Sequence, residues 1–156
     1  MGDRALEFVD TNILIYAHDV DAGDRHWRAK EIVRALWDSG VGMISTQVLN
    51  EFYVNATQKI PSPMDPPRAR AVIEAYLSWH VQTPGPESVL AASEIQQRYR
   101  ISYWDALIVH AASRGGASVL FTEELNAGQV MEGVQIVNPL LDSAVHDEKA
   151  RFSTPE

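Results

Sequence analysis

The chain has 156 residues, of which 46% are hydrophobic, and a formal net charge of −8. This length suits one domain with one core, and the acidic charge argues against a general nucleic-acid coat protein, which is normally basic. The absence of cysteine excludes disulfides, thiolate zinc sites and cysteine nucleophiles. No stretch has the roughly 20 apolar residues that span a bilayer, and the charged first ten residues do not resemble a signal peptide. We therefore expect a cytoplasmic protein with no membrane contact.

Short apolar segments alternate with segments of helical periodicity in the first half of the chain. Either Ser45 or Thr46 is suited to cap a helix, and the proline-rich stretch at 60–67 breaks the pattern. The pattern predicts strands at 5–10 and 41–45 and helices at 11–19, 22–39, 46–59 and 67–80.

The second half of the chain continues this alternation. It predicts helices at 86–100 and 102–116 and strands at 81–85, 117–121 and 134–138, with Gly115 and Gly116 ending the second helix. We expect one domain over residues 1–141, and a polar, flexible tail over residues 142–156. Strands that alternate with helices indicate an α/β fold with a mainly parallel sheet.

Two acidic residues follow predicted strands. Asp10 ends the first strand, and Glu124, next to Glu123, follows the strand at 117–121. The carboxyl ends of parallel strands lie at one edge of a sheet, where ligands bind. Two further acids, Glu51 and Asp105, interrupt apolar stretches of predicted helices.

Each of these acids also has an explanation that involves no chemistry. Asp10 suits the N-cap of the following helix, and Ser102 with Asp105 has the spacing of a capping box. Glu51 fits the edge of an amphipathic helix, and Glu124 fits a solvated loop. The spacing alone leaves these alternatives open.

One functional hypothesis covers all four acids. Converging carboxylates repel one another unless a cation binds. Oxygen ligands without sulfur or a histidine cluster favour Mg²⁺ or Mn²⁺, which activates water and stabilises the pentavalent phosphate in phosphodiester hydrolysis. Thr11, Asn12 and Thr122 lie beside the acids and are candidates to orient ligands or to hold the scissile phosphate.

The remaining polar and aromatic residues give weaker signals. The five histidines are scattered, so we expect them to be structural or solvated rather than catalytic. The basic residues near positions 25–34, 59–70 and 98–100 are expected mainly on solvated helix faces, with local positive charge around the acidic residues as the alternative. A second group is expected mainly in the core or in a dimer contact, with stacking on an RNA base as the alternative: Tyr16, Phe52, Tyr53, Tyr103 and Trp104.

Four segments of the chain together resemble a known family. They are "FVDTNILIYAHD", "STQVLNEFYVNATQKIP", "RISYWDALIVHAA" and "VLFTEELNAGQVMEGVQIVNP". From about Phe8 to Pro139 they closely resemble the PIN domain, specifically the VapC-type toxins of prokaryotic toxin–antitoxin pairs. The resemblance implies a PIN-like three-layer α/β/α fold with a short, mainly parallel central sheet, and a Mg²⁺- or Mn²⁺-dependent endoribonuclease. It also implies a homodimer and a cognate antitoxin that inserts a segment into the acidic groove.

The resemblance places the four acids of the family on Asp10, Glu51, Asp105 and Glu124. It implies that Asp10 and Asp105 bind the main cation, that Glu51 holds a second cation or orients the attacking water, and that Glu124 completes the site. Relatives most often carry aspartate at the fourth position. Because glutamate adds a methylene there, direct ligation of metal by Glu124 is an open question.

Two other functions stay open at this point. A PIN fold with weakened or lost nuclease activity would only bind RNA or a partner. A different metal phosphohydrolase on a similar scaffold would hydrolyse small phosphate esters, although the sequence has no phosphate-cradling glycine loop.

Overall fold

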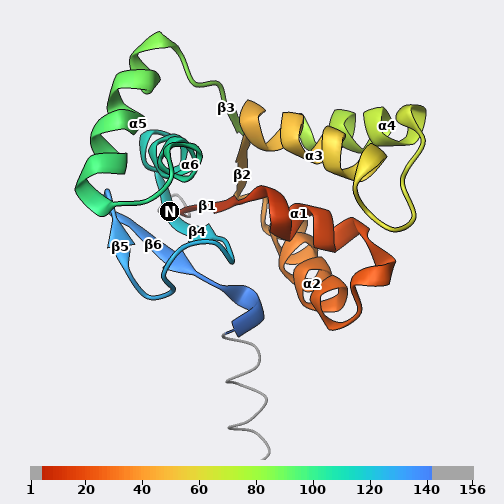
Figure 1. Cartoon of the computed structure of the whole chain (residues 1–156). Coiled ribbons are helices and arrows are strands. Elements are labelled where there is room, and N and C mark those ends of the chain that lie inside the picture. Colours follow the sequence, from red (N-terminus) through yellow and green to blue (C-terminus); the bar gives the residue numbers. More distant parts are fainter. Residues whose placement is uncertain (1–4, 142–156) are drawn as a thin grey trace, which may run out of the picture.

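The computed structural model describes residues 5–141, which form a central sheet with helices on both sides (Figure 1). The strands are β1 Leu6–Val9, β2 Gly42–Ser45, β3 His80–Gln82, β4 Ala117–Phe121, β5 Val130–Met131 and β6 Val134–Val137. The helices are α1 Thr11–His18, α2 Asp24–Ser39, α3 Thr46–Gln58, α4 Pro66–Tyr76, α5 Pro86–Tyr99 and α6 Tyr103–Arg114, with the short 3₁₀ helix η1 at Val20–Ala22.

The sheet has the strand order β3-β2-β1-β4-β6-β5. Every neighbouring pair is parallel except β5 and β6. Helix α1 packs against α2 on one side of the sheet, and α5 packs against α6 on the other side (Figure 1). The expected three-layer α/β/α fold with a mainly parallel sheet is therefore confirmed.

The strand order changes direction between β1 and β4. The chain first builds outward from β1 through β2 to β3, and then crosses over to place β4 on the other side of β1. Val9 pairs with Phe121 at the carboxyl ends of these two strands, and the amide of Asp10 donates to the carbonyl of Phe121 at 3.0 Å. Such a switch point opens a crevice at the carboxyl edge of the sheet.

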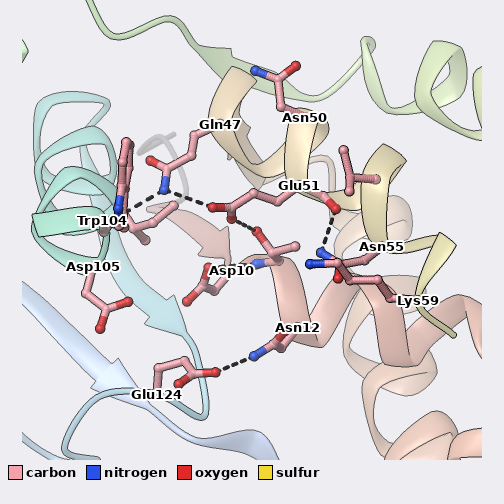
Figure 2. A pocket seen from close by; sticks show the side chains of 13 residues that line it. Asp10, Asn12, Gln47, Asn50, Glu51, Asn55, Lys59, Trp104, Asp105 and Glu124 are labelled. Carbon is pink, nitrogen blue, oxygen red and sulfur yellow. Dashed lines mark hydrogen bonds between the residues drawn. The ribbon is translucent and has the colours of Figure 1, made fainter. Parts of the chain in front are cut away.

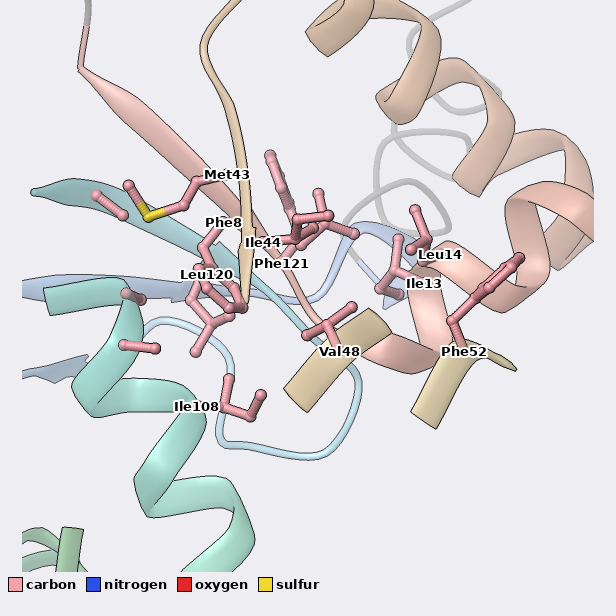
Figure 3. Packing of buried hydrophobic residues seen from close by; sticks show 14 of the residues in the cluster. Phe8, Ile13, Leu14, Met43, Ile44, Val48, Phe52, Ile108, Leu120 and Phe121 are labelled. Carbon is pink, nitrogen blue, oxygen red and sulfur yellow. The ribbon is translucent and has the colours of Figure 1, made fainter. Parts of the chain in front are cut away.

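The core lies on both faces of the central strands. Phe8, Ile44 and Leu120 are fully buried because helices cover both sides of a parallel sheet (Figure 3). The helices contribute apolar side chains to the same cluster, among them Val48 and Phe52. Burying a side chain of this size contributes roughly 1.5–3 kcal/mol, so the core holds the strand ends in place.

The start of α3 follows the predicted capping chemistry, and α4 has a cap of the same kind. The Ser45 hydroxyl accepts from the amide of Val48, which makes Ser45 the cap of α3. Asp65 caps α4 in the same way, with Pro66 in the first turn. Both residues give the first amides of a helix a hydrogen-bond partner.

Some boundaries differ from the prediction. Helix α4 ends at Tyr76 rather than near position 80, and β3 begins at His80 rather than Val81. The short elements η1 and β5 were not predicted. The expected tail at 142–156 lies outside the described residues. Between residues 5 and 141, no helix is long and apolar enough to cross a membrane.

Candidate functional site

A cleft of about 470 Å³ opens at the carboxyl edge of the sheet, at the switch point between β1 and β4. It is lined by residues of α1, α3 and α6 and of the loop after β4 (Figure 2). All four predicted acids line this cleft: Asp10, Glu51, Asp105 and Glu124. The fold thus gathers carboxylates from four separate segments of the sequence.

Asp10 is the most buried of the four acids, with 7% of its surface exposed. Its Oδ1 accepts from the amide of Thr11 at 2.7 Å, so it does cap α1. Its Oδ2 accepts from the hydroxyl of Thr122 at 2.9 Å. The capping role and a role in the cleft are therefore compatible, because each oxygen has its own donor.

Burial raises the pKa of Asp10 to about 6. The hydrogen bonds from Thr11 and Thr122 oppose this shift, and the negative charges of Asp105 and Glu51 add to it. The carboxylates of Asp105 and Glu51 are therefore close enough for their negative charges to disfavour the ionised form of Asp10.

Glu51 and Glu124 are each held by a polar side chain of α1. The hydroxyl of Thr11 donates to Oε1 of Glu51 at 2.6 Å, and the Asn12 amide donates to Oε1 of Glu124. The Thr122 hydroxyl also accepts from the backbone amide of Glu124 at 3.0 Å. Each predicted supporting residue thus orients one of the acids.

Asp105 lies in the first turn of α6 and its side chain points into the cleft (Figure 2). The Ser102 hydroxyl accepts from the amide of Asp105 at 3.0 Å, which is one half of the capping box. The other half is not formed, and between residues 5 and 141 the Asp105 carboxylate has no hydrogen-bond donor. A negative charge is favoured at this end of a helix, and here it is available to a ligand.

A family model for the PIN domain matches residues 8–130 of the chain. The chain belongs to the PIN domain family. The comparison with curated proteins gave no match.

Solved structures similar to this PIN domain include toxins and toxin–antitoxin complexes. VapC20 of Mycobacterium tuberculosis, a toxin that cleaves the sarcin–ricin loop, is 26% identical with a TM-score of 0.56, over 76% of this chain and 91% of that one. A toxin–antitoxin complex from Klebsiella pneumoniae is 22% identical with a TM-score of 0.62, over 85% and 97%. DNA-bound VapBC from Salmonella typhimurium is 19% identical with a TM-score of 0.61, over 87% and 99%. The resemblance to VapC-type PIN domains is confirmed.

The PIN domain also contains a bridge that the sequence did not reveal. Nε2 of Gln47 donates to Oε2 of Glu51 at 3.4 Å and to the carbonyl oxygen of Trp104 at 3.3 Å, so it links α3 to α6 (Figure 2). Gln47 lies one helical turn before Glu51, and this spacing was the available signal. Asn50 and Asn55 of α3 also line the cleft and were not predicted, and Lys59, which directly follows the last residue of α3, lines it too.

The donor atoms of this PIN domain fit a hard divalent cation. All four acids offer oxygen, the chain has no cysteine, and no histidine of the described part of the chain lines the cleft. Within residues 5–141, no three acidic, histidine or cysteine side chains are already close enough to hold a metal ion. Binding of one cation by three or more of the carboxylates would therefore require them to move toward one another within the cleft, whereas one or two carboxylates can hold Mg²⁺ together with water.

The two adjacent glutamates of the PIN domain point to different partners. Glu123 accepts from the hydroxyl of Tyr16 at 2.6 Å and does not line the cleft, whereas Glu124 does. None of the histidines between residues 5 and 141 lines the cleft either. His18 pairs with the hydroxyl of Tyr76, and His26 with the carbonyl of Tyr16, while His146 lies outside the described residues.

The basic residues lie in three different environments. Lys59 lines the acidic cleft. Lys30, Arg34 and Arg68 line a separate cavity of about 380 Å³ at the other end of α1. Arg98 pairs with Glu132 on the surface, as expected of a solvated helix face.

Proposed function

We propose that this PIN domain is a Mg²⁺- or Mn²⁺-dependent endoribonuclease and the toxin of a cytoplasmic toxin–antitoxin pair. The observation that carries the proposal is the convergence of Asp10, Glu51, Asp105 and Glu124 on one cleft at the switch point of the sheet. Acids from four segments would weaken the fold through mutual repulsion unless a cation were to bind among them.

The polar residues around the cleft have definable roles in this proposal. Asp10 and Asp105 would hold the main cation, Glu51 a second cation or the attacking water, and Glu124 would complete the site. When bound, the cation activates water and stabilises charge on the phosphate. Thr11 and Thr122 keep the carboxylates of Glu51 and Asp10 turned toward the cleft.

Lys59 supplies a positive charge at the rim of the same cleft. Its side chain forms no ion pair with any residue of the described range 5–141, so its ammonium is available to an RNA phosphate. An RNA backbone can thus be attracted locally although the whole chain carries a net charge of −8.

Cleavage of a panel of single-stranded RNAs in Mg²⁺ or Mn²⁺ tests the proposal. Asp10→Asn and Asp105→Asn are expected to lose at least about 100-fold in rate, as when a group that stabilises transition-state charge is removed. Glu123→Gln is the matched control, because Glu123 is bonded to Tyr16 outside the cleft. Equal cleavage by wild type and both Asn variants would refute the assignment.

A second candidate is a PIN domain that only binds RNA or a partner. It is favoured by the lack of any preformed three-residue metal group within residues 5–141 and by the bond that turns Glu124 toward Asn12. A binding protein of this kind would show no rise in melting temperature on addition of Mn²⁺, whereas a metal-binding site would.

In this proposal, the protein partners of the chain are inferred from its family. Two of the similar structures are toxin–antitoxin complexes, which supports a cognate antitoxin, and the resemblance supports a homodimer. An arginine of the antitoxin would pair with the carboxylates of the cleft. Co-purification with a small protein encoded next to this chain, and light scattering of the isolated protein, test the two assignments separately.

A further inference from the structure

The acidic cleft continues into a second cavity of about 370 Å³. The two cavities share four lining residues: Gln47, Asn50, Glu51 and Trp104. Thr46 and Pro84 line the far side of the second cavity together with Leu107. A chain molecule lying over the acids can therefore pass directly into this second space.

Trp104 is the aromatic residue that lines both cavities within the described range 5–141. It lies next to Asp105 in the first turn of α6, and 63% of its surface is exposed. The indole packs edge-to-face against Tyr103, at 5.2 Å between ring centroids, and Gln47 donates to the backbone carbonyl of the same residue. An exposed and positioned indole beside a carboxylate site has no packing function in the core.

The chemistry of the second cavity fits a neutral, flat group better than a phosphate. Among residues 5–141, Glu51, at the boundary with the acidic cleft, is the only charged residue that lines it, and it would repel an anion. The other lining groups are neutral: hydroxyl and amide groups on α3, and the apolar surfaces of Pro84, Trp104 and Leu107.

We propose that this second cavity binds the base of the RNA nucleotide next to the scissile phosphate, with the base stacked on Trp104. This rests on the proposed function, since it takes RNA to lie over the acids. Stacking on an aromatic side chain accepts any base. Asn50 adds a means of discrimination, because its exposed amide offers both a donor and an acceptor to a base edge.

Binding of fluorescently labelled single-stranded RNA in EDTA tests this site without hydrolysis. Trp104→Ala should weaken binding about 5- to 100-fold, the range found when a stacking aromatic is removed. Trp104→Phe should keep most of the affinity, and Trp104→Leu, which is apolar but not aromatic, should not. The matched control is Trp27→Ala, since Trp27 is 64% exposed on α2 and lines neither cavity.

The outcomes separate this inference from the proposed nuclease. Equal RNA affinity of wild type and Trp104→Ala, including no measurable affinity of either, would overturn the base site even if wild type cleaves RNA in Mg²⁺. If Trp104→Ala loses RNA affinity and Trp27→Ala does not, while the wild type cleaves no RNA, the base site would be supported and the nuclease refuted. Equal losses with Trp104→Ala and Trp27→Ala would also overturn it, because the loss would not be specific to the cleft.

Discussion

The hydroxyl of Thr122 donates to Oδ2 of Asp10 at 2.9 Å, although the two residues are 112 positions apart in the chain. The bond joins the carboxyl ends of β1 and β4, the neighbouring strands at which the sheet order reverses. It also gives a buried carboxylate a donor, and the same hydroxyl accepts from the amide of Glu124. One hydroxyl thus bonds to the carboxylate of Asp10 and to the backbone of Glu124.

Thr122→Val is expected to lower the free energy of unfolding by about 1–3 kcal/mol. The substitution keeps the shape of the side chain but leaves the buried Asp10 oxygen and the Glu124 amide without their partner. Urea unfolding measures the loss. Thr122→Ser, which keeps the hydroxyl, should be close to wild type, and equal losses in both variants would show that packing matters here rather than the hydrogen bonds.

Asp10→Asn should make the metal-free protein more stable at pH 7. Asn has nearly the same shape, accepts from the Thr11 amide, and removes a buried charge that Glu51 and Asp105 repel. Melting curves in EDTA should therefore shift upward, and the rise in melting temperature that Mn²⁺ causes in wild type should disappear. An Asn variant that melts lower in EDTA and still responds to Mn²⁺ would contradict this account of Asp10.

Glu124→Gln should reduce the rate of RNA cleavage about 10-fold, as expected when a supporting group of a metal site is lost. The adjacent Glu123→Gln should leave the rate unchanged, because Glu123 is bonded to Tyr16 away from the cleft. Rates at several Mn²⁺ concentrations distinguish weaker metal binding from slower chemistry. If the Glu123 variant loses as much activity as the Glu124 variant, the assignment of the fourth acid is wrong.

His18 should make the stability of the protein fall with decreasing pH in the acidic range. Burial, followed by the nearby charges of Arg68, His26 and Lys30, lowers the pKa of His18 to about 4. The unfolded chain therefore binds this proton more readily, so stability is complete above pH 6.5 and is lost as the pH falls toward 4.

The comparison of wild type with His18→Gln isolates this effect. Between pH 7 and pH 4, the free energy of unfolding of wild type should fall by up to about 3 kcal/mol more than that of the variant. Urea unfolding across this range measures the difference. A constant difference at all pH values would show that His18 does not titrate in this way.

Most of the fold could be predicted from the sequence because strands and helices differ in hydrophobic period. The strand β6 was predicted, but its hairpin partner β5 was missed, since β5 has only two residues. Its turn is formed by Glu132 and Gly133, both with positive φ, which is the backbone of a type I′ turn. The tyrosine hydroxyl of Tyr99 contacts both the amide and the carboxylate of Glu132, a tertiary support that no local pattern contains.

The acids of the candidate site could also be predicted, because a carboxylate at a strand end or in an apolar helix stands out from its neighbours. The bond from Gln47 to the carbonyl of Trp104 could not be predicted, because it depends on α3 and α6 lying on opposite sides of the cleft. Only the one-turn spacing of Gln47 and Glu51 is visible in the sequence. The exposure of Trp104 could not be predicted for the same reason: whether an aromatic residue is buried depends on how its helix packs.

The most direct test of the central claim is an anomalous diffraction map of crystals soaked in Mn²⁺. The account predicts a manganese peak in the cleft with carboxylate oxygens of Asp10 and Asp105 around it, at distances typical of metal ligation. The contradicting result is a preparation that cleaves RNA with Mn²⁺ while its crystals show manganese only outside this cleft.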